Sequence, residues 1–332
     1  MTANSMRALV TGGAGFIGSG LAHALVAQGN DVVVIDDLST GALRNLPSGV
    51  IYPGPLDILT DAPRIDPYVA SADCVFHLAG GVGVEYVLKN SVRTIAINVV
   101  GTEVMISLAA MHRKPFLLAS TSEVYGNAFG PLSEGLASEE TSSLTPYARS
   151  KWQAEQIALA YHARGQASVV IVRLFNVVGA RQTWRYGMVL PTFVKQALQG
   201  SDITIFGRGD NRRSFIDVRD AVSSMVETMQ TTAGRGEVIN IGSNDSVSIA
   251  ELAGRIKRAV RSTSRIVHIP YRETYRSSHL NPHERIPEIS KLIALTGFRR
   301  RYTLEDSITD AVSYVSYELV PTDHRHRGAV VG

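Results

Sequence analysis

One stretch near the amino terminus, residues 7–36, restricts the possible folds of this chain more than any other. The apolar run Arg7–Val10 predicts a short buried strand, and a glycine-rich turn follows it. Leu21–Gln28 then predicts a helix, and Asp31–Asp36 predicts a second strand. Strand, turn, helix and strand in this order predict a βαβ unit, and therefore a parallel sheet.

The turn itself carries glycines at 12, 15 and 18. In such a turn Gly12 permits the tight bend, Gly15 lets the backbone approach a pyrophosphate, and Gly18 lets the helix pack close to the strand. The backbone of Phe16 and Ile17 is expected to join this site, because a helix N-terminus attracts anions. The spacing therefore predicts dinucleotide binding.

An acidic residue closes the second strand. Asp36 is placed to accept hydrogen bonds from the ribose hydroxyls of an adenosine, and Asp37 is the alternative for that role. A carboxylate there would repel a 2′-phosphate, so the sequence predicts NAD as the cofactor and not NADP.

Strands and helices continue to alternate, which predicts an α/β fold with a Rossmann-type doubly wound parallel sheet. The further strands expected are Asp73–Leu78, Pro115–Ser120, Ser168–Val178 and Glu237–Gly242, and the helices are Val92–His112 and Tyr147–Arg164.

A smaller C-terminal domain is expected to be interleaved with the sheet. We expect the NAD-binding domain to take residues 1–179, with 215–245 returning to it. Residues 180–214 and 246–320 would form the substrate domain, and 321–332 a tail.

Composition excludes several classes of protein. The 332 residues are 45% hydrophobic and 19% charged, with net charge +3, and no dense Lys/Arg block favours nucleic acid. The single cysteine, Cys74, excludes an internal disulfide and fits a reducing cytoplasm. We expect no signal peptide, no apolar run that crosses a membrane, and a frayed tail rather than a metal site at His324–Arg327.

Tyr147 and Lys151 stand four residues apart in a predicted helix that begins after Thr145-Pro146. This spacing places them on one face, one turn apart. A neighbouring ammonium should lower the pKa of the tyrosine, which would make it a proton-transfer group near neutral pH. A chance pair on a solvated helix has the same spacing.

A polar loop follows the strand Pro115–Ser120. Thr121-Ser122-Glu123 should lie at the carboxyl edge of the sheet, where open α/β sheets bind their ligands. A capped turn would explain the hydroxyls, but it gives no reason for Glu123.

Together, the glycine turn, this loop and the Tyr147/Lys151 pair resemble the extended short-chain dehydrogenase/reductase family. The resemblance is to its NAD-dependent nucleotide-sugar epimerases, dehydratases and decarboxylases, and it runs from about Arg7 to about Tyr314. It implies an enzyme with a nucleotide-sugar substrate. It also implies a homodimer formed through the helices Asn98–His112 and Tyr147–Arg164, although core packing would explain their apolar faces equally well.

The resemblance implies roles for particular residues. Tyr147 would take the proton of the sugar 4-hydroxyl as hydride passes from C4 to NAD, Thr121 would hydrogen-bond the same hydroxyl, and Lys151 would bind the nicotinamide ribose. Asn98, opening its helix, would support the lysine. Further contacts implied for the cofactor are Asp57 with adenine and Ala79-Gly80 along NAD.

The substrate contacts implied lie mostly in the C-terminal half. Those expected are Ser122, Asn176 in Phe175-Asn176-Val177-Val178-Gly179, Phe206 beside the nucleobase, and two phosphate-binding arginines, Arg213 and Arg285.

Three reactions can follow oxidation at C4, and the resemblance favours decarboxylation of UDP-glucuronate, with Glu123 among the catalytic residues. Thr121-Ser122-Glu123 resembles the triplet of UDP-glucuronate decarboxylases and of some 4,6-dehydratases, and Arg181 or Arg185 would be the cation near C6. Ser150 before Lys151, where decarboxylases have glycine, keeps a UDP-sugar 4-epimerase open. A 4,6-dehydratase is the third alternative, and a simple NAD-dependent oxidoreductase is the alternative of another class.

Overall fold

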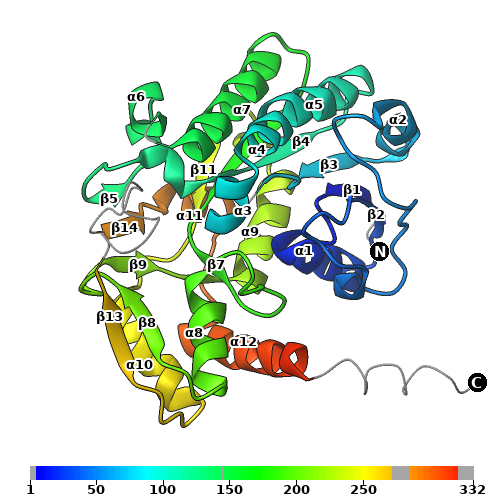
Figure 1. Ribbon diagram of the computed structural model, residues 1–332. Coiled ribbons are helices and arrows are strands. Elements are labelled where there is room, and N and C mark those ends of the chain that lie inside the picture. Colours follow the sequence, from blue (N-terminus) through cyan, green and yellow to red (C-terminus); the bar gives the residue numbers. More distant parts are fainter. Residues whose placement is uncertain (1–4, 82, 144, 271–283, 321–332) are drawn as a thin grey trace, which may run out of the picture.

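A six-stranded parallel sheet forms the centre of the computed structural model, which describes residues 5–81, 83–143, 145–270 and 284–320. The strand order is β11-β6-β4-β3-β1-β2 (Figure 1). The strands are β1 Arg7–Thr11, β2 Asp31–Ile35, β3 Cys74–His77, β4 Phe116–Thr121, β6 Val169–Leu174 and β11 Val238–Ile241. They are apolar almost throughout because helices cover both faces, so the predicted α/β fold is confirmed.

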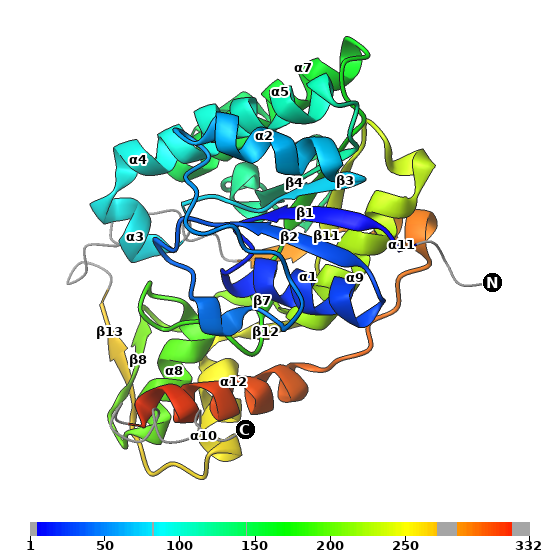
Figure 2. The same cartoon turned by 90° about the vertical axis from the view of Figure 1, so that its right-hand side faces the viewer.

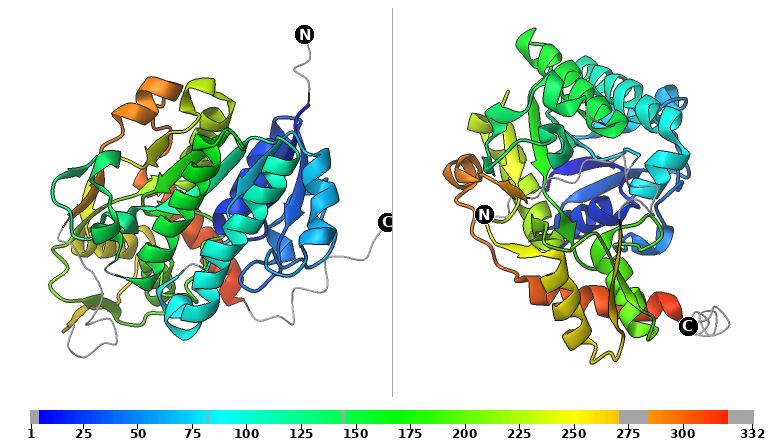
Figure 3. Two further views of the ribbon diagram at one scale, coloured as in Figure 1. Left: turned by 90° about the horizontal axis from the view of Figure 1, so that it is seen from above. Right: turned by 60° about the vertical axis from the view of Figure 1, so that its left-hand side comes forward.

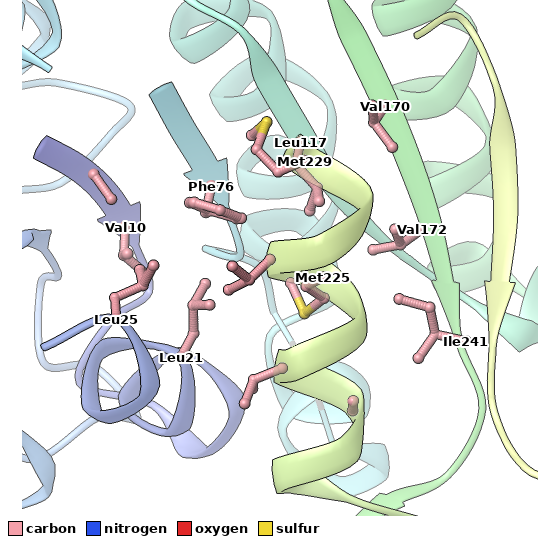
Figure 4. Close-up of a cluster of buried hydrophobic side chains, with 14 of the residues drawn as sticks. Val10, Leu21, Leu25, Phe76, Leu117, Val170, Val172, Met225, Met229 and Ile241 are labelled. Carbon is pink, nitrogen blue, oxygen red and sulfur yellow. The ribbon is translucent and has the colours of Figure 1, made fainter. Parts of the chain in front are cut away.

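Two helical layers enclose the sheet (Figure 2). One contains α1 (Phe16–Ala27), α9 (Val218–Gln230) and α11 (Ser290–Thr296), and the other contains α2 (Ala62–Ser71), α5 (Thr102–Met111) and α7 (Pro146–Ala163). In the first layer, Leu21 and Leu25 of α1 and Met225 and Met229 of α9 point at the sheet around Phe76 (Figure 4). Burial of these apolar side chains ties the glycine turn, at the start of α1, to the sheet.

The predicted helix Val92–His112 is continuous but irregular. It comprises α4 (Ser91–Ala96), a π-helical turn η2 (Ile97–Gly101) and α5. The prediction that Asn98 opens its helix was therefore wrong, because Asn98 lies in the π-helical turn inside it. The stretch Ser91–Met111 is also long and apolar enough to cross a membrane, contrary to the sequence-based expectation, but half of its apolar window is buried in the protein.

Other boundaries differ at particular residues. The predicted strand Ser168–Val178 is split into β6 and β7 (Val177–Val178), because Asn176 between them has φ of +34°. The strand β7 pairs instead with β10 (Ile216–Asp217). The helix expected at Leu21 already begins at Phe16, directly after Gly15.

The C-terminal lobe is built mainly from α8 (Val189–Leu198), α10 (Ile249–Ala259) and α12 (Leu304–Leu319) with short strands. In the right-hand view of Figure 3 the yellow α10 and the red α12 lie together below the sheet. The strands are β8 Ile203–Phe206 with β13 Ile266–Ile269, and β12 Ser246–Ser248, β9 Arg212–Ser214, β14 Glu284–Pro287 and β5 Pro131–Leu132 in one four-stranded sheet. The remaining elements are η1 Leu43–Asn45, α3 Val84–Lys89, η3 Ser122–Tyr125, η4 Glu134–Leu136, α6 Glu139–Ser142 and η5 Thr232–Gly234.

Chain segments pass between the sheet and this lobe more than once. Residues 215–245 supply α9 and β11, which lie with the large sheet. The helix α11, within the range 246–320 expected for the substrate domain, also packs on α9 and β11. The domain division stays a prediction, and the tail 321–332 lies outside the described residues.

The sole cysteine of the sequence, Cys74, lies in β3 and is buried. Burial raises the pKa of its thiol to about 12. At neutral pH the thiol therefore stays protonated and unreactive, as expected of a structural cysteine.

Candidate active site

A cavity of about 870 Å³ follows the carboxyl edge of the sheet and reaches the C-terminal lobe. Most of the residues predicted from the sequence line it: Gly12, Gly15, Phe16, Ile17, Gly18, Asp36, Asp57, Ala79, Thr121, Ser122, Glu123, Tyr147, Lys151, Asn176, Phe206 and Arg285. The cavity is thus continuous from the glycine turn to the Tyr147/Lys151 pair and on to residues of the lobe.

The glycine turn fits a pyrophosphate. Gly12 has φ of +67°, and a Cβ at Gly18 would lie only 2.1 Å from the Gly12 carbonyl oxygen, so both positions require glycine. Gly15 is the N-cap of α1, and no side chain caps this helix in the described structure. The N–H groups of the first turn are therefore left to an anion in the cavity.

Asp36 lies directly after β2, at the end of the cavity that contains the glycine turn. Its carboxylate accepts hydrogen bonds from the backbone N–H groups of Ala14 at 2.9 Å and Leu38 at 2.8 Å. Burial raises the pKa of Asp36, while these two bonds lower it. The carboxylate is therefore held in one orientation beside the glycine turn, as ribose binding would require.

Lys151 lines the cavity farther from the glycine turn, where a hydrogen bond holds its side chain in place. It is buried on α7, and its Nζ donates to the carbonyl oxygen of Ala119 at 2.9 Å. Desolvation lowers the pKa of Lys151 to about 8, and the charge of Glu155, one turn further along α7, opposes this shift. The ammonium is therefore largely retained at neutral pH.

Asn98 reaches the same place from the π-helical turn. Its Nδ2 donates to the Ser150 hydroxyl at 2.9 Å, and its buried Oδ1 has no partner. A Cβ at Gly80 would lie 2.9 Å from that Oδ1 and 3.2 Å from Lys151 Nζ. Only a glycine therefore leaves this approach open, and the unpaired amide oxygen is available to a bound group.

Tyr147 differs from the sequence-based expectation. Burial raises its pKa well above the usual range, and the negative charge of Glu123 raises it further, whereas a hydrogen bond with Thr121 lowers it. The predicted lowering by Lys151 was wrong for the protein alone, because the lysine ammonium is directed at the Ala119 carbonyl.

Glu123 shares its end of the cavity with a buried cation. Arg285, on β14, lines the cavity, and its Nη2 donates to the Gly126 carbonyl oxygen at 3.3 Å while its Nε is unpaired. Burial lowers the pKa of Arg285, and the Glu123 charge raises it. A carboxylate, a phenol and a guanidinium are thus brought together from η3, α7 and β14.

Several other predicted residues lie elsewhere. Arg181 donates to the Ser19 hydroxyl of α1 at 3.1 Å, and the Arg185 guanidinium stacks on Trp184 at 5.9 Å. Arg213 pairs in register with Arg285 in neighbouring strands, with its Nη1 on the Arg212 carbonyl. Arg181, Arg185 and Arg213 are described, and none is among the residues that line the cavity.

Sequence reasoning missed a buried ion pair behind the site. Arg173 of β6 binds both oxygens of Glu155 on α7, at 3.0 and 2.7 Å, and the Ser120 hydroxyl also donates to Glu155. Glu155 follows Lys151 by four residues, the same spacing as Tyr147 to Lys151, so extending that helical face by one turn would have found it.

The family model for the NAD dependent epimerase/dehydratase family matches residues 8–242. This chain belongs to that family. The protein is therefore an NAD-dependent enzyme. The glycine turn, the Asp36 carboxylate and the unpaired Oδ1 of Asn98 fit this cofactor.

Relatives within the family are similar over nearly the whole length. The UDP-N-acetyl-alpha-D-glucosaminuronate decarboxylase of Bacillus cytotoxicus is 36% identical over 93% of this chain and 97% of its own. The UDP-glucuronic acid decarboxylase 1 of Danio rerio is 32% identical over 94% of this chain and 73% of its own.

One solved structure resembles this fold over nearly the whole chain. It is the UDP-glucuronic acid 4-epimerase of Bacillus cereus in complex with UDP-glucuronic acid and NAD, 29% identical, with a TM-score of 0.83. The match covers 94% of this chain and all of the other.

Proposed function

We propose that this enzyme is a UDP-hexuronate decarboxylase. The observation that carries the proposal is that Glu123, Tyr147 and Arg285 all line the cavity, and that the charge of Glu123 acts on both of the others. The two decarboxylases at 36% and 32% identity support it, since both act on a UDP-sugar whose C6 is a carboxylate.

Each of the three side chains has a task in this reaction. The glycine turn, Asp36 and Lys151 would hold NAD, which would supply a reversible acceptor for the hydride of C4. Tyr147 takes the proton of the 4-hydroxyl, with Thr121 hydrogen-bonded beside it, which leaves a 4-keto sugar. That sugar is a β-keto acid, so its C5–C6 bond breaks with loss of carbon dioxide.

Arg285, which the resemblance implied as a phosphate-binding residue, is the cation that we assign to the C6 carboxylate in place of Arg181 and Arg185. It is buried, lies in the cavity and has an unpaired Nε, whereas the other two are bound to Ser19 and stacked on Trp184. A guanidinium fork suits a carboxylate because two parallel hydrogen bonds form. Glu123 lines the same cavity and would relay a proton from solvent to C5, where that proton takes the place of the lost carboxylate.

A 4-epimerase is the second candidate, supported by the resemblance to the Bacillus cereus enzyme. It needs Thr121, Tyr147 and NAD but gives Glu123 no task. A homodimer and a cytoplasmic location also remain proposals, as the resemblance and the single buried cysteine imply.

An NMR time course with NAD tests the reaction. UDP-glucuronate, its 2-acetamido analogue and UDP-glucose are incubated separately. UDP-pentose signals with release of carbon dioxide from either uronate would support decarboxylation. Formation of the 4-epimer alone would contradict it and establish the second candidate.

Replacing Glu123 separates the two steps. Glu123→Gln should slow formation of the UDP-pentose about 100-fold or more, the usual contribution of a proton-transfer group, and should slow the reduction of NAD by substrate much less. Absorbance of reduced NAD and the NMR signals of the UDP-pentose measure the two steps, with Glu134→Gln as the control. Equal loss in both steps would remove the special task of Glu123.

A further inference from the structure

Arg93 of α4 forms two ion pairs at the adenosine end of the cavity. Its Nη2 lies 3.1 Å from Asp37 Oδ2 and 2.9 Å from Asp57 Oδ2. Asp37 follows β2 and Asp57 precedes α2, so one guanidinium joins α4 to both ends of the connection between these two elements. Both acids line the cavity.

The segment that carries Arg93 borders the cavity. Tyr86 of α3 and Ser91 of α4 are among the lining residues, and Figure 2 shows α3 between the upper helical layer and the C-terminal lobe. The Tyr86 ring meets the Tyr186 ring edge-on, with centroids 6.0 Å apart. The α3–α4 segment is thus attached at Tyr86 to the loop before α8, and at Arg93 to the two acids.

Arg93 also determines how Asp57 is presented. Asp57 Oδ1 accepts the backbone N–H of Leu59 at 2.9 Å, and Oδ2 accepts Arg93. Without the guanidinium, Asp57 would keep only its backbone bond, and two carboxylates would face the cavity with no cation between them. Both changes would disfavour a bound dinucleotide, which is itself an anion.

We propose that Arg93 is a positioning residue for the cofactor. Its ion pairs hold α4 to Asp37 and Asp57 and thereby slow the release of NAD. The inference depends on NAD binding alone and holds for any reaction of the sugar. Its failure would leave the proposed decarboxylation untouched, and failure of decarboxylation would leave it standing.

Arg93→Met tests the role of the two ion pairs, because methionine keeps an unbranched side chain and removes the charge. Bound reduced NAD is displaced by excess NAD in a stopped-flow instrument, and its fluorescence gives the release rate. Two exposed ion pairs predict release about three- to tenfold faster. Turnover at saturating NAD should stay at the wild-type value, so that KM for NAD rises and kcat does not.

Arg265→Met is the matched control, because Arg265 also pairs with a carboxylate, Asp202, at 2.7 Å, and is exposed in the C-terminal lobe. It should release the dinucleotide at the wild-type rate. Arg93→Lys, which keeps the charge but not the fork, should fall between wild type and Arg93→Met.

Salt provides the decisive comparison. Exposed ion pairs are screened, so the ratio of the Arg93→Met rate to the wild-type rate should fall towards one at high salt. Equal rates at low salt would overturn the proposal. So would a ratio that salt does not change, because the effect would then come from packing, or an equal acceleration in Arg265→Met.

Discussion

Burial and the carboxylate of Glu123 both raise the pKa of Tyr147 in the protein without its cofactor, so accepting the proton of the 4-hydroxyl requires a positive charge beside the phenol, which the oxidised nicotinamide ring of NAD would supply. The lysine one turn away does not offset them, since its ammonium is bound to the Ala119 carbonyl. The pKa of Tyr147 and the hydrogen bond of Lys151 thus depend on neighbours from other elements, and the four-residue spacing of the pair does not reveal these neighbours.

Replacing Tyr147 by phenylalanine should reduce turnover about 100- to 10,000-fold, because the proton of the 4-hydroxyl loses its acceptor. NAD affinity, measured by fluorescence titration, should change little, since the glycine turn and Lys151 remain. Tyr161→Phe, near the far end of the same helix, should behave as wild type in both measurements. Retained turnover in Tyr147→Phe would remove the residue from the chemistry.

His77 makes the stability of the protein depend on pH. It is fully buried between the hydroxyls of Thr11 and Thr102, and burial lowers its pKa from 6.5 to about 3. Between these two values the unfolded chain binds a proton that the folded protein does not. The free energy of unfolding should therefore fall as the pH drops from 6.5 towards 3.

Urea unfolding at pH 7 and pH 5 measures this loss of stability. In His77→Gln, where the proton can no longer bind, the loss between the two pH values should be smaller than in wild type. His268→Gln, at an exposed position, should leave the wild-type loss unchanged. An identical loss in His77→Gln would show that other groups cause the acid sensitivity.

At the scale of elements, sequence patterns predicted those helices, strands and turns that depend on neighbouring residues. The glycine turn, its flanking strands and the helix α7 follow from runs of neighbouring residues, and the site around Gly12, Thr121 and Tyr147 follows with them. Asn176 was not predicted to break its strand, since its positive φ arises where β7 turns away to pair with β10.

The position of Arg285 could not be read from spacing for a related reason. It enters the cavity because β14 pairs with β9 and β5, strands more than 70 residues earlier in the chain. Arg181 and Arg185 are nearer in sequence to the catalytic helix and were the more obvious candidates. Pairing between distant strands, and not local pattern, decides which arginine faces Glu123.

The ion pair of Glu155 and Arg173 joins two such elements, α7 and β6, and both side chains are buried. Glu155→Gln should lower the free energy of unfolding by about 3–5 kcal/mol, because it leaves the guanidinium buried without its counter-charge. The double variant Glu155→Gln with Arg173→Met should recover much of that loss. Urea denaturation measures both, and a double variant no more stable than the single one would contradict this account.

At the scale of the whole molecule, one cavity draws residues from both the sheet and the C-terminal lobe. The chain passes between the two parts repeatedly, with α9, β11 and α11 returning to the sheet from the later half. Cofactor-lining and lobe residues are therefore held in one connected structure.

Assembly is the remaining property at this scale. Val92, Val100 and Met111 are exposed by 81%, 48% and 70% along the α4–α5 stretch, where the family resemblance implies a second copy. Val100→Glu should convert a dimer to monomers in sedimentation velocity, because burying the new charge would be costly. Ile293→Glu, on α11, is the control and should leave the mass unchanged. A wild-type monomer would contradict the expectation.

Cys74, sealed inside β3, makes this protein convenient for site-directed labelling. A buried thiol with a pKa of about 12 will not react with a maleimide at neutral pH, so the natural sequence already serves as an unlabelled background. A cysteine introduced at the exposed Lys89, at the end of α3, would then be the only site to take up a dye. Its fluorescence would show whether α3 moves as the cofactor enters and leaves.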